Sequence, residues 1–246
     1  MNKTIEELIK RQSVRAFLDK EISKEDKDLI LEASVNAPSA GNMQMYSIID
    51  VTDQKLKDRL AVLCDNQPFI AKAKMVLIYC ADYQKWLDGF KALGLEPRHP
   101  DAGDLLLSIE DAVIAAQNSV TAAWSMGIGS CYIGDIMENF EEIIDTLKLP
   151  QFVYPACMVV FGYTDEQHIQ KQKPKRVDNK YVVFENEYKR LNKDELKDMF
   201  EYKTTSVGYE AWMKKFMEWK YNSDFSKEMS RSANKYLERY KKDVKK

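Results

Sequence analysis

Two arginines and a serine near the start of the chain stand close enough in sequence to bind one phosphate. The stretch is Arg11-Gln12-Ser13-Val14-Arg15, and it follows a short predicted helix. A guanidinium group presents paired N–H donors that match phosphate oxygens, and the serine hydroxyl adds another. Taken alone, such a stretch is more typical of a solvated helix end, so it gains meaning only from the segments that accompany it.

A second segment has the small residues that let backbone approach a flat ligand. It reads Ala37-Pro38-Ser39-Ala40-Gly41-Asn42-Met43-Gln44 and lies between a predicted helix and a predicted strand. Small side chains leave room for a ring, and Ser39 and Asn42 can hydrogen-bond heteroatoms on its rim. The same composition also suits an ordinary connecting loop.

A third segment, residues 127–134, contains three glycines in the order Gly-Ile-Gly-Ser-Cys-Tyr-Ile-Gly. It is not the dinucleotide fingerprint G-x-G-x-x-G, because the glycine spacing differs and a helix rather than a strand precedes it. Gly134 would allow close approach to a ring, with backbone N–H groups facing it. A helix end followed by a buried strand is the alternative, and both can hold together.

A fourth segment is a short basic cluster, Lys173-Pro174-Lys175-Arg176, some residues before Phe184-Glu-Asn-Glu-Tyr188. Clusters of this kind are usually solvated surface. It becomes informative only if a phosphate lies nearby.

The elements that must hold these segments alternate between helix and strand, which favours a layered fold of mixed helices and strands. Thr4 and Glu7 predict a capping box for the first helix, and Ser23 with Asp26 predicts the start of the second. Further helices are predicted over residues 53–63, 82–93, 103–126 and 141–147 and from 193 onward, and strands over residues 46–51, 75–80, 155–163 and 181–184.

The helix over residues 103–126 has the widest apolar stripe and should be central or line an interface. The charged tail, residues 223–246, is expected to be either a helix packed across a partner or a solvated arm. Loops over residues 96–101 and 203–211 are expected to select the substrate.

Composition excludes several functions. The net charge of -2 gives no general attraction to nucleic acid or an anionic membrane, and the apolar runs are far shorter than the about 20 residues that cross a bilayer. No export signal is visible, and the four scattered cysteines suit a reduced cytoplasmic setting rather than a metal site. The only histidines, His99 and His168, are expected to be exposed loop residues. With so few histidines, any chemistry is expected to need a bound cofactor.

Together the four segments resemble the nitroreductase superfamily of flavoproteins, in the branch of oxygen-insensitive nitroreductases and flavin reductase P. The opening motif R-x-S-x-R matches Arg11, Ser13 and Arg15, and the loop motif A-P-S-x-x-N-x-Q matches residues 37–44. The glycine turn G-[LI]-G-x-x-Y-I-G matches residues 127–134, and the late basic loop and E-N-x-Y match residues 173–176 and 185–188. The resemblance covers about the first three quarters of the chain, and the conjunction is more specific than any one motif.

The resemblance implies an α+β fold with a central, mainly antiparallel sheet flanked by helices, in an intertwined homodimer. It implies one domain over residues 1–246, with an FMN-binding core to about residue 190 and a helical C-terminal extension over about 191–246. FMN would be held by Arg11, Gln12, Ser13, Arg15, Gln67, Tyr132, Ile133, Gly134, Asp135, Lys173, Lys175 and Arg176, with Pro38, Ser39, Ala40 and Asn42 reaching across from the other subunit.

Two departures from the family pattern concern the site itself. Asp135 stands where this branch often has a second glycine, so a carboxylate joins the site, with effects on redox potential or fit. The branch motif K-P-R is one residue longer here, which leaves open whether Lys173 or Lys175 reaches the phosphate.

The activity that the resemblance implies is ping-pong transfer of hydride from NADPH or NADH, through FMN N5, to nitroaromatics, quinones or flavins. Positioning and a tuned flavin carry such chemistry, so no catalytic base is expected. Two alternatives stay open: a flavin-dependent dehydrogenase or reductive dehalogenase on the same fold, and a non-catalytic flavin-binding protein.

Overall fold

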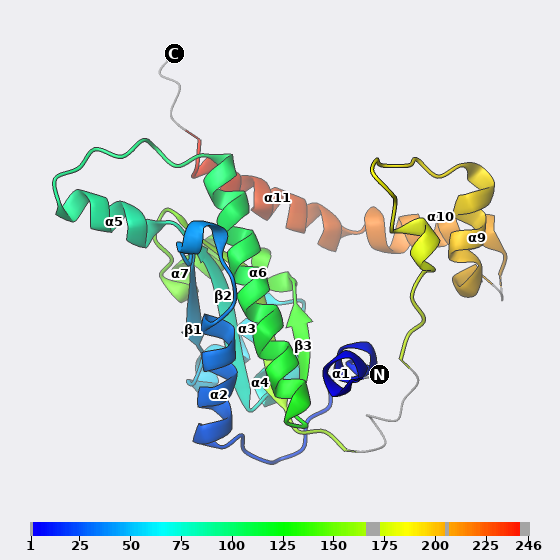
Figure 1. Cartoon of the computed structure of the whole chain (residues 1–246), viewed down its shortest axis with the longest axis horizontal. Helices are drawn as coiled ribbons and strands as arrows, with labels where there is room; N and C mark the ends of the chain where they lie inside the picture. Colours follow the sequence, from blue (N-terminus) through cyan, green and yellow to red (C-terminus); the bar gives the residue numbers. More distant parts are fainter. Residues whose placement is uncertain (1, 166–172, 205–206, 242–246) are drawn as a thin grey trace. The chain divides into compact units, whose positions relative to one another are not determined.

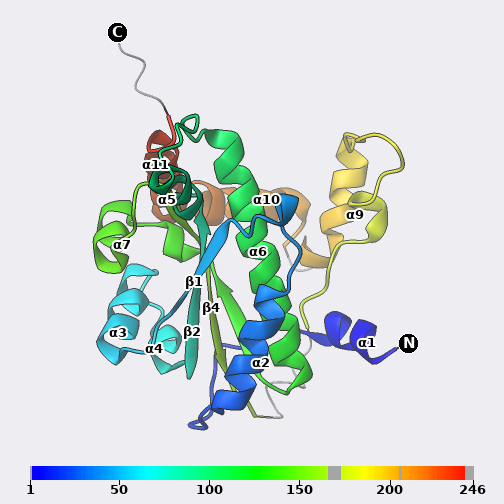
Figure 2. The same cartoon turned by 60° about the vertical axis from the view of Figure 1, so that its left-hand side comes forward.

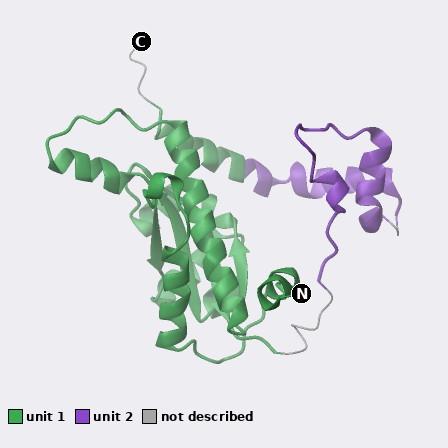
Figure 3. Cartoon of the chain, in the orientation of Figure 1, with its two compact units in different colours: residues 1–171, 229–246 green, residues 172–228 purple. Residues whose placement is uncertain are grey.

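A computed structural model describes residues 2–165, 173–204 and 207–241. The chain divides into two compact units, residues 1–171 with 229–246 and residues 172–228 (Figure 3). We call them the first and the second unit. The expected division into a core and an extension near residue 190 stays a prediction.

The first unit is built on a four-stranded antiparallel sheet in the order β1-β2-β4-β3 (Figure 1). Its strands are β1 (Tyr46–Asp50), β2 (Met75–Asp82), β3 (Gly129–Ile133) and β4 (Val153–Gly162). Every residue of β2 and β4 is buried, as the uninterrupted apolar runs predict for strands that are covered on both faces. The predicted α+β arrangement is therefore confirmed.

Helices α2 (Lys24–Val35) and α6 (Ala102–Ser125) cover one face of this sheet (Figure 2). Ser23 caps α2 as predicted, because its hydroxyl accepts a hydrogen bond from the Asp26 amide at 3.0 Å. Where the two helices touch, α6 carries alanines and serines, and the Ser34 hydroxyl donates to the Ala115 carbonyl at 2.8 Å. The predicted central position of α6 is confirmed.

Helices α3 (Gln54–Leu63), α4 (Pro68–Lys72) and α7 (Phe140–Leu147) lie on the other face, with the short turn η2 (Asp135–Met137) (Figure 2). Together with this face of β2 and β4 they form a second hydrophobic core, which includes Ile78, Met158 and Val160. Helix α5 (Gln84–Ala92) follows β2. Strand β3 therefore lies at the edge of a sheet whose two faces are both covered by helices.

Two local predictions are wrong. Helix α1 (Lys3–Lys10) is capped by Asn2, whose side chain accepts from the Ile5 amide at 3.0 Å, so Thr4 lies inside the first turn instead of before it. Residues 181–184 form no strand: the turn η3 (Asn179–Tyr181) takes their start, and Val182 and Val183 stay exposed without a paired strand. Their β-branched side chains suit a strand only where a neighbouring strand accepts their backbone.

The second unit is helical, with α9 (Lys193–Thr204), α10 (Tyr209–Phe216) and the π-helical turn η4 (Met217–Tyr221). Helix α11 (Asp224–Glu238) leads from it into the first unit. Neither expectation for the tail describes residues 229–241, because Tyr236 and Tyr240 are buried in the core of their own chain. Among the described residues, no helix is both long and apolar enough to cross a bilayer.

The start of α6 is held by a bidentate ion pair between Arg98 and Asp104, at 2.6 and 2.7 Å. Asp104 also accepts from the Asp101 amide at 2.9 Å, which completes a capping box. The Arg98 guanidinium, with help from this amide, holds the pKa of the Asp104 carboxyl below its usual value.

Asp104→Asn is expected to lower the free energy of unfolding at pH 7 by about 1 kcal/mol, a modest figure because Arg98 is largely exposed. Since folding depresses this pKa, the contribution exists above the unfolded value of 3.8 and disappears as the pH falls through the folded value. Urea unfolding of both proteins at pH 7 and pH 3 tests this. A difference that is equally large at pH 3 would contradict the assignment.

Candidate functional site

The arm formed by residues 11–15 docks on the edge strand β3. The Val14 amide donates to the Ser130 carbonyl at 2.9 Å, and Ser13 pairs with Ser130 in a parallel bridge. Val14 is buried, whereas Ser13 and Arg15 on either side of it are exposed. The extended backbone therefore turns these two side chains away from the core, toward any ligand that lies along β3.

Gly129 is what lets the arm come so close. A Cβ atom at this position would lie 2.6 Å from Val14 Cγ2 and 2.8 Å from Val14 Cβ, closer than carbon atoms approach. The first residue of β3 must therefore be glycine for Val14 to be buried here.

Four of the predicted site residues lie around Cys131, in the middle of β3. Burial raises the pKa of the Cys131 thiol, while Arg15, a hydrogen bond from Ser13 and Arg11 act to lower it, and Asp135 adds to the increase. Among the residues that the structure describes, neither Arg11 nor Arg15 forms an ion pair with a carboxylate. The arm thus carries two positive charges that are available to an anion.

Gln67 is held in a defined orientation at the start of α4. Its Nε2 donates to the Cys64 carbonyl and to Asp135 Oδ2, both at 2.8 Å. Both amide hydrogens are thereby used, so the side chain offers its Oε1 as an acceptor. The carboxylate of Asp135, the departure noted in the sequence, is what fixes this orientation.

Gly134, at the end of β3, differs in kind from Gly129. Its φ of -78° suits any residue, and a Cβ atom there would meet only Met137 Cε, at 4.0 Å. The fold of this chain does not require glycine at this exposed position. A glycine here leaves the backbone uncovered by a side chain, which is what close approach of a ligand would need. Ile133 beside it is buried, and Tyr132 is half-buried with its hydroxyl 3.4 Å from Gln117 Oε1.

The second predicted segment forms a tight loop after α2, with the turn η1 (Ala40–Asn42) at its centre. Gly41, Asn42 and Gln44 all have positive φ angles, of 56°, 56° and 49°. The Ser39 hydroxyl closes the loop by accepting from the Gln44 amide at 3.1 Å. Pro38 and Asn42 are exposed, and Ser39 and Ala40 are half-buried.

Within one chain this loop and the arm are not brought together. The loop is bonded to Asp111 in the first half of α6, whereas the arm docks on β3, which follows the end of that helix (Figure 1). Ser125, the last residue of α6, lies 14 residues after Asp111, which corresponds to about 21 Å along a helix axis. The two segments lie toward opposite ends of α6.

The late basic segment belongs to the second unit, so its part in the site stays a prediction. Lys175 and Arg176 are exposed and Lys173 is half-buried. Arg176 Nη1 donates to the Pro174 carbonyl at 2.9 Å, within the segment.

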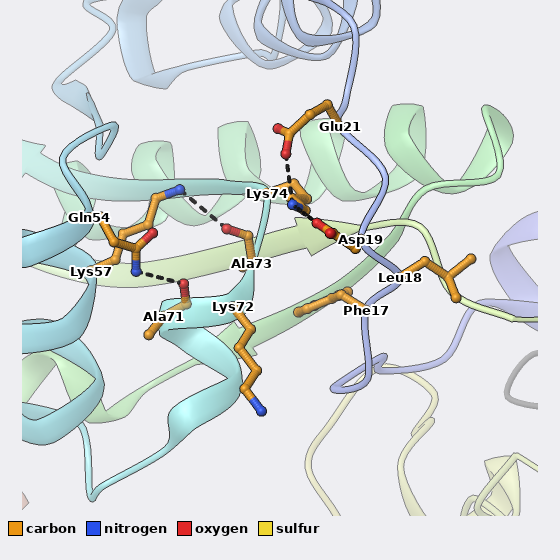
Figure 4. A pocket seen from close by; sticks show the side chains of 10 residues that line it. All are labelled: Phe17, Leu18, Asp19, Glu21, Gln54, Lys57, Ala71, Lys72, Ala73 and Lys74. Atoms are coloured by element: carbon orange, nitrogen blue, oxygen red, sulfur yellow. Dashed lines mark hydrogen bonds and ion pairs between the residues drawn. The ribbon is translucent and has the colours of Figure 1, made fainter.

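A separate hollow of about 520 Å³ lies between residues 17–21 and the α3–α4 region (Figure 4). It contains none of the predicted site residues. Lys74 pairs there with Asp19 at 2.5 Å and Glu21 at 2.7 Å, and the buried Lys57 ammonium donates to the Ala73 carbonyl at 3.2 Å (Figure 4). These contacts fasten the chain that continues from the arm, and we assign this hollow a structural role.

Sequence reasoning missed the residues that position the two segments. Val14 with Gly129 docks the arm, and Asp111 anchors the loop. No local pattern indicated Asp111, because at helical spacing it lies outside the apolar stripe predicted for α6. His99 is half-buried rather than exposed, edge-on to Phe152 at 5.4 Å between ring centroids, and His168 lies outside the described residues.

An antiparallel sheet covered by helices on both faces, with a cationic arm on its edge strand, defines an α+β protein. Comparison with known proteins gives the family. A sequence model of the Nitroreductase family matches residues 8–163, and the chain belongs to this family.

Relatives are similar over most of the chain. An FMN reductase [NAD(P)H] of Bacillus subtilis is 30% identical over 97% of this chain and 92% of its own length. An oxygen-insensitive NADPH nitroreductase of Salmonella typhimurium is 33% identical over 78% of this chain and 77% of its own. The structure of an NADPH:FMN oxidoreductase from Vibrio harveyi complexed with NAD+ superposes with a TM-score of 0.82 at 26% identity, covering 96% of this chain and 98% of that one.

Proposed function

We propose that this protein is an FMN-dependent NAD(P)H oxidoreductase that reduces small acceptors such as nitroaromatics, quinones or flavins. The observation that carries the proposal is the cluster along β3. It contains the guanidinium groups of Arg11 and Arg15, which form no ion pair within the described part of the chain, the oriented amide of Gln67 and the exposed backbone at Gly134. The names of the relatives, FMN reductase and NADPH nitroreductase, support the same activity.

The residues present fit FMN. Arg11, Ser13 and Arg15 supply the charge and the donors that a phosphate needs, and Gln67 Oε1 can accept from an N–H of the ring system. Gly134 leaves the backbone amides at the end of β3 accessible. When bound, FMN supplies the two-electron chemistry, and the protein binds, orients and tunes it. The remaining proposed contacts are Gln12, Tyr132, Ile133, Asp135, Lys173, Lys175 and Arg176.

The site is completed by a second copy of the chain. Since the loop and the arm lie toward opposite ends of α6, the proposed contacts of Pro38, Ser39, Ala40 and Asn42 must come from the partner subunit. Apolar side chains that a monomer would leave in water support such a dimer, on α1 with Ile5, Leu8 and Ile9 and on α6 with Leu106, Leu107, Val113 and Ile114. Four buried free thiols support a reducing, cytoplasmic setting.

The proposal is tested with purified protein under anaerobic conditions. We expect a yellow dimer that releases FMN on denaturation, is bleached by NADPH or NADH, and regains its colour when menadione or nitrofurazone is added. A protein that lacks flavin and does not bind added FMN would refute the proposal. Flavin that NAD(P)H leaves oxidised, but that another substrate bleaches, would instead favour the dehydrogenase alternative.

Gly129, the first residue of β3, and Gly134, which follows its last residue, give a paired prediction. Gly134→Ala should leave unfolding of the FMN-free protein within about 0.5 kcal/mol of wild type, yet weaken FMN binding about tenfold, because the added methyl group faces the ligand. Gly129→Ala should destabilise the FMN-free protein by about 1–3 kcal/mol through its clash with Val14. Urea unfolding and flavin fluorescence titration measure both quantities. Equal stability losses in the two variants would contradict the distinction.

A further inference from the structure

Asp111 is a buried carboxylate that bonds to both ends of the loop after α2. It is 1% exposed. Its Oδ1 accepts from the Ala40 amide at 2.8 Å, and its Oδ2 accepts from the Met45 amide at 3.0 Å. No cation among the described residues forms an ion pair with it. A buried charge is costly unless it is hydrogen-bonded. The two charge-assisted hydrogen bonds from the loop therefore stabilise this carboxylate, and the carboxylate in turn restrains the loop.

The two amides bracket the part of the loop that needs support. Between them lie Gly41, Asn42 and Gln44 with their positive φ angles, a conformation that side chains other than glycine adopt at a cost. Such backbone persists where its surroundings restrain it from several sides. Trp86 Nε1 adds one restraint by donating to the Met43 carbonyl at 3.0 Å, and Asp111 holds both ends of the loop from α6.

The loop presents a side chain that no described residue of its own subunit binds. The Asn42 side chain is exposed and makes no hydrogen bond to another described residue. A strained, doubly anchored turn that presents a polar amide outward is arranged for something outside the chain.

We infer that Asp111 is a positioning residue, which fixes the 39–44 loop in the shape that completes the FMN site of the partner subunit. This inference rests on the proposed function. Its effect acts in trans: Asp111 of one subunit governs the site whose arm, with Arg15, belongs to the other.

Asparagine at this position separates shape from hydrogen bonding. Its side chain is isosteric, but it has one acceptor oxygen, and its NH₂ group must face one of the two backbone N–H groups. We expect Asp111→Asn to weaken FMN binding at least tenfold, measured by fluorescence titration of the FMN-free dimer. Asp104→Asn is the matched control, since it removes another buried carboxylate of α6 and should leave FMN affinity unchanged.

Mixed dimers test the action in trans. Differently tagged Arg15→Ala and Asp111→Asn chains are combined, and the purified mixed dimer is titrated with FMN. One site then carries both defects and the other carries none, so we expect one FMN per dimer with wild-type affinity, while each variant homodimer binds weakly at both sites. Stoichiometry comes from flavin absorbance, independently of turnover.

The outcomes are separable. Asp111→Asn homodimers that bind FMN as tightly as wild type overturn the inference and leave the proposed function intact. Weak binding by both sites of the mixed dimer overturns it too, because Asp111 would then act on its own subunit's site. Wild-type protein that binds no FMN overturns the proposed function itself.

Discussion

Arg15→Ala is expected to weaken FMN binding by about 100-fold and to remove NAD(P)H oxidation with it. The loss corresponds to a charge-assisted bidentate contact with phosphate, worth about 1.5–3 kcal/mol. The guanidinium is exposed beside β3 and forms no ion pair with any carboxylate that the structure describes, so its removal costs the folded chain little. Flavin fluorescence titration of the FMN-free variant measures the affinity, and turnover of the variant as purified, with no FMN added, measures the loss of activity.

Two companions sharpen this prediction. Arg15→Lys keeps the charge but loses the planar fork, so its FMN affinity should fall between those of the alanine variant and wild type. Arg59→Ala removes an arginine that only pairs with Glu142 on the surface, and it should change neither affinity nor turnover. An Arg15→Ala protein that retains full flavin and turnover would place the phosphate elsewhere.

Tyr236→Ala should destabilise the protein by about 3–5 kcal/mol, the usual cost of deleting a buried aromatic ring. The ring is 1% exposed and packs edge-on against Phe140 and Tyr154, with centroids 4.6 Å away in both cases. One turn earlier, the Ser232 hydroxyl accepts from the Phe140 amide at 3.0 Å. Loss of Tyr236 therefore loosens the C-terminal helix and α7 together. Urea unfolding at a single FMN concentration measures the change.

Tyr236→Phe isolates the ring from its hydroxyl. The hydroxyl oxygen is buried and has no hydrogen-bond partner within the described part of the chain. Removing it should therefore change stability by less than about 0.5 kcal/mol, or increase it. Tyr221→Ala, at an exposed tyrosine, is the control and should be neutral. A phenylalanine variant as unstable as the alanine variant would show that the hydroxyl, not the packing, matters.

Local patterns account for most of what was predictable. The Ser23 cap, the apolar runs of β2 and β4 and the stripe of α6 each depend on residues within a few positions of one another, and the structure has all three. Predictions failed where a competing neighbour took over, as when Asn2 rather than Thr4 capped α1. They failed also where burial depends on distant partners, as for Tyr236 in a tail that its charges made look solvated.

Residue types and their spacing along the chain were enough to indicate the family, the arm proposed to bind phosphate and the small-residue loop, because each motif consists of residues that are close together in sequence. Three-dimensional packing was needed to show that Val14 docks against Gly129, that Asp135 orients Gln67 and that Asp111 anchors the loop. Those pairings join residues that are far apart in sequence. Their distances follow from the order of the strands and the length of α6, which no local pattern of hydrophobicity or charge encodes.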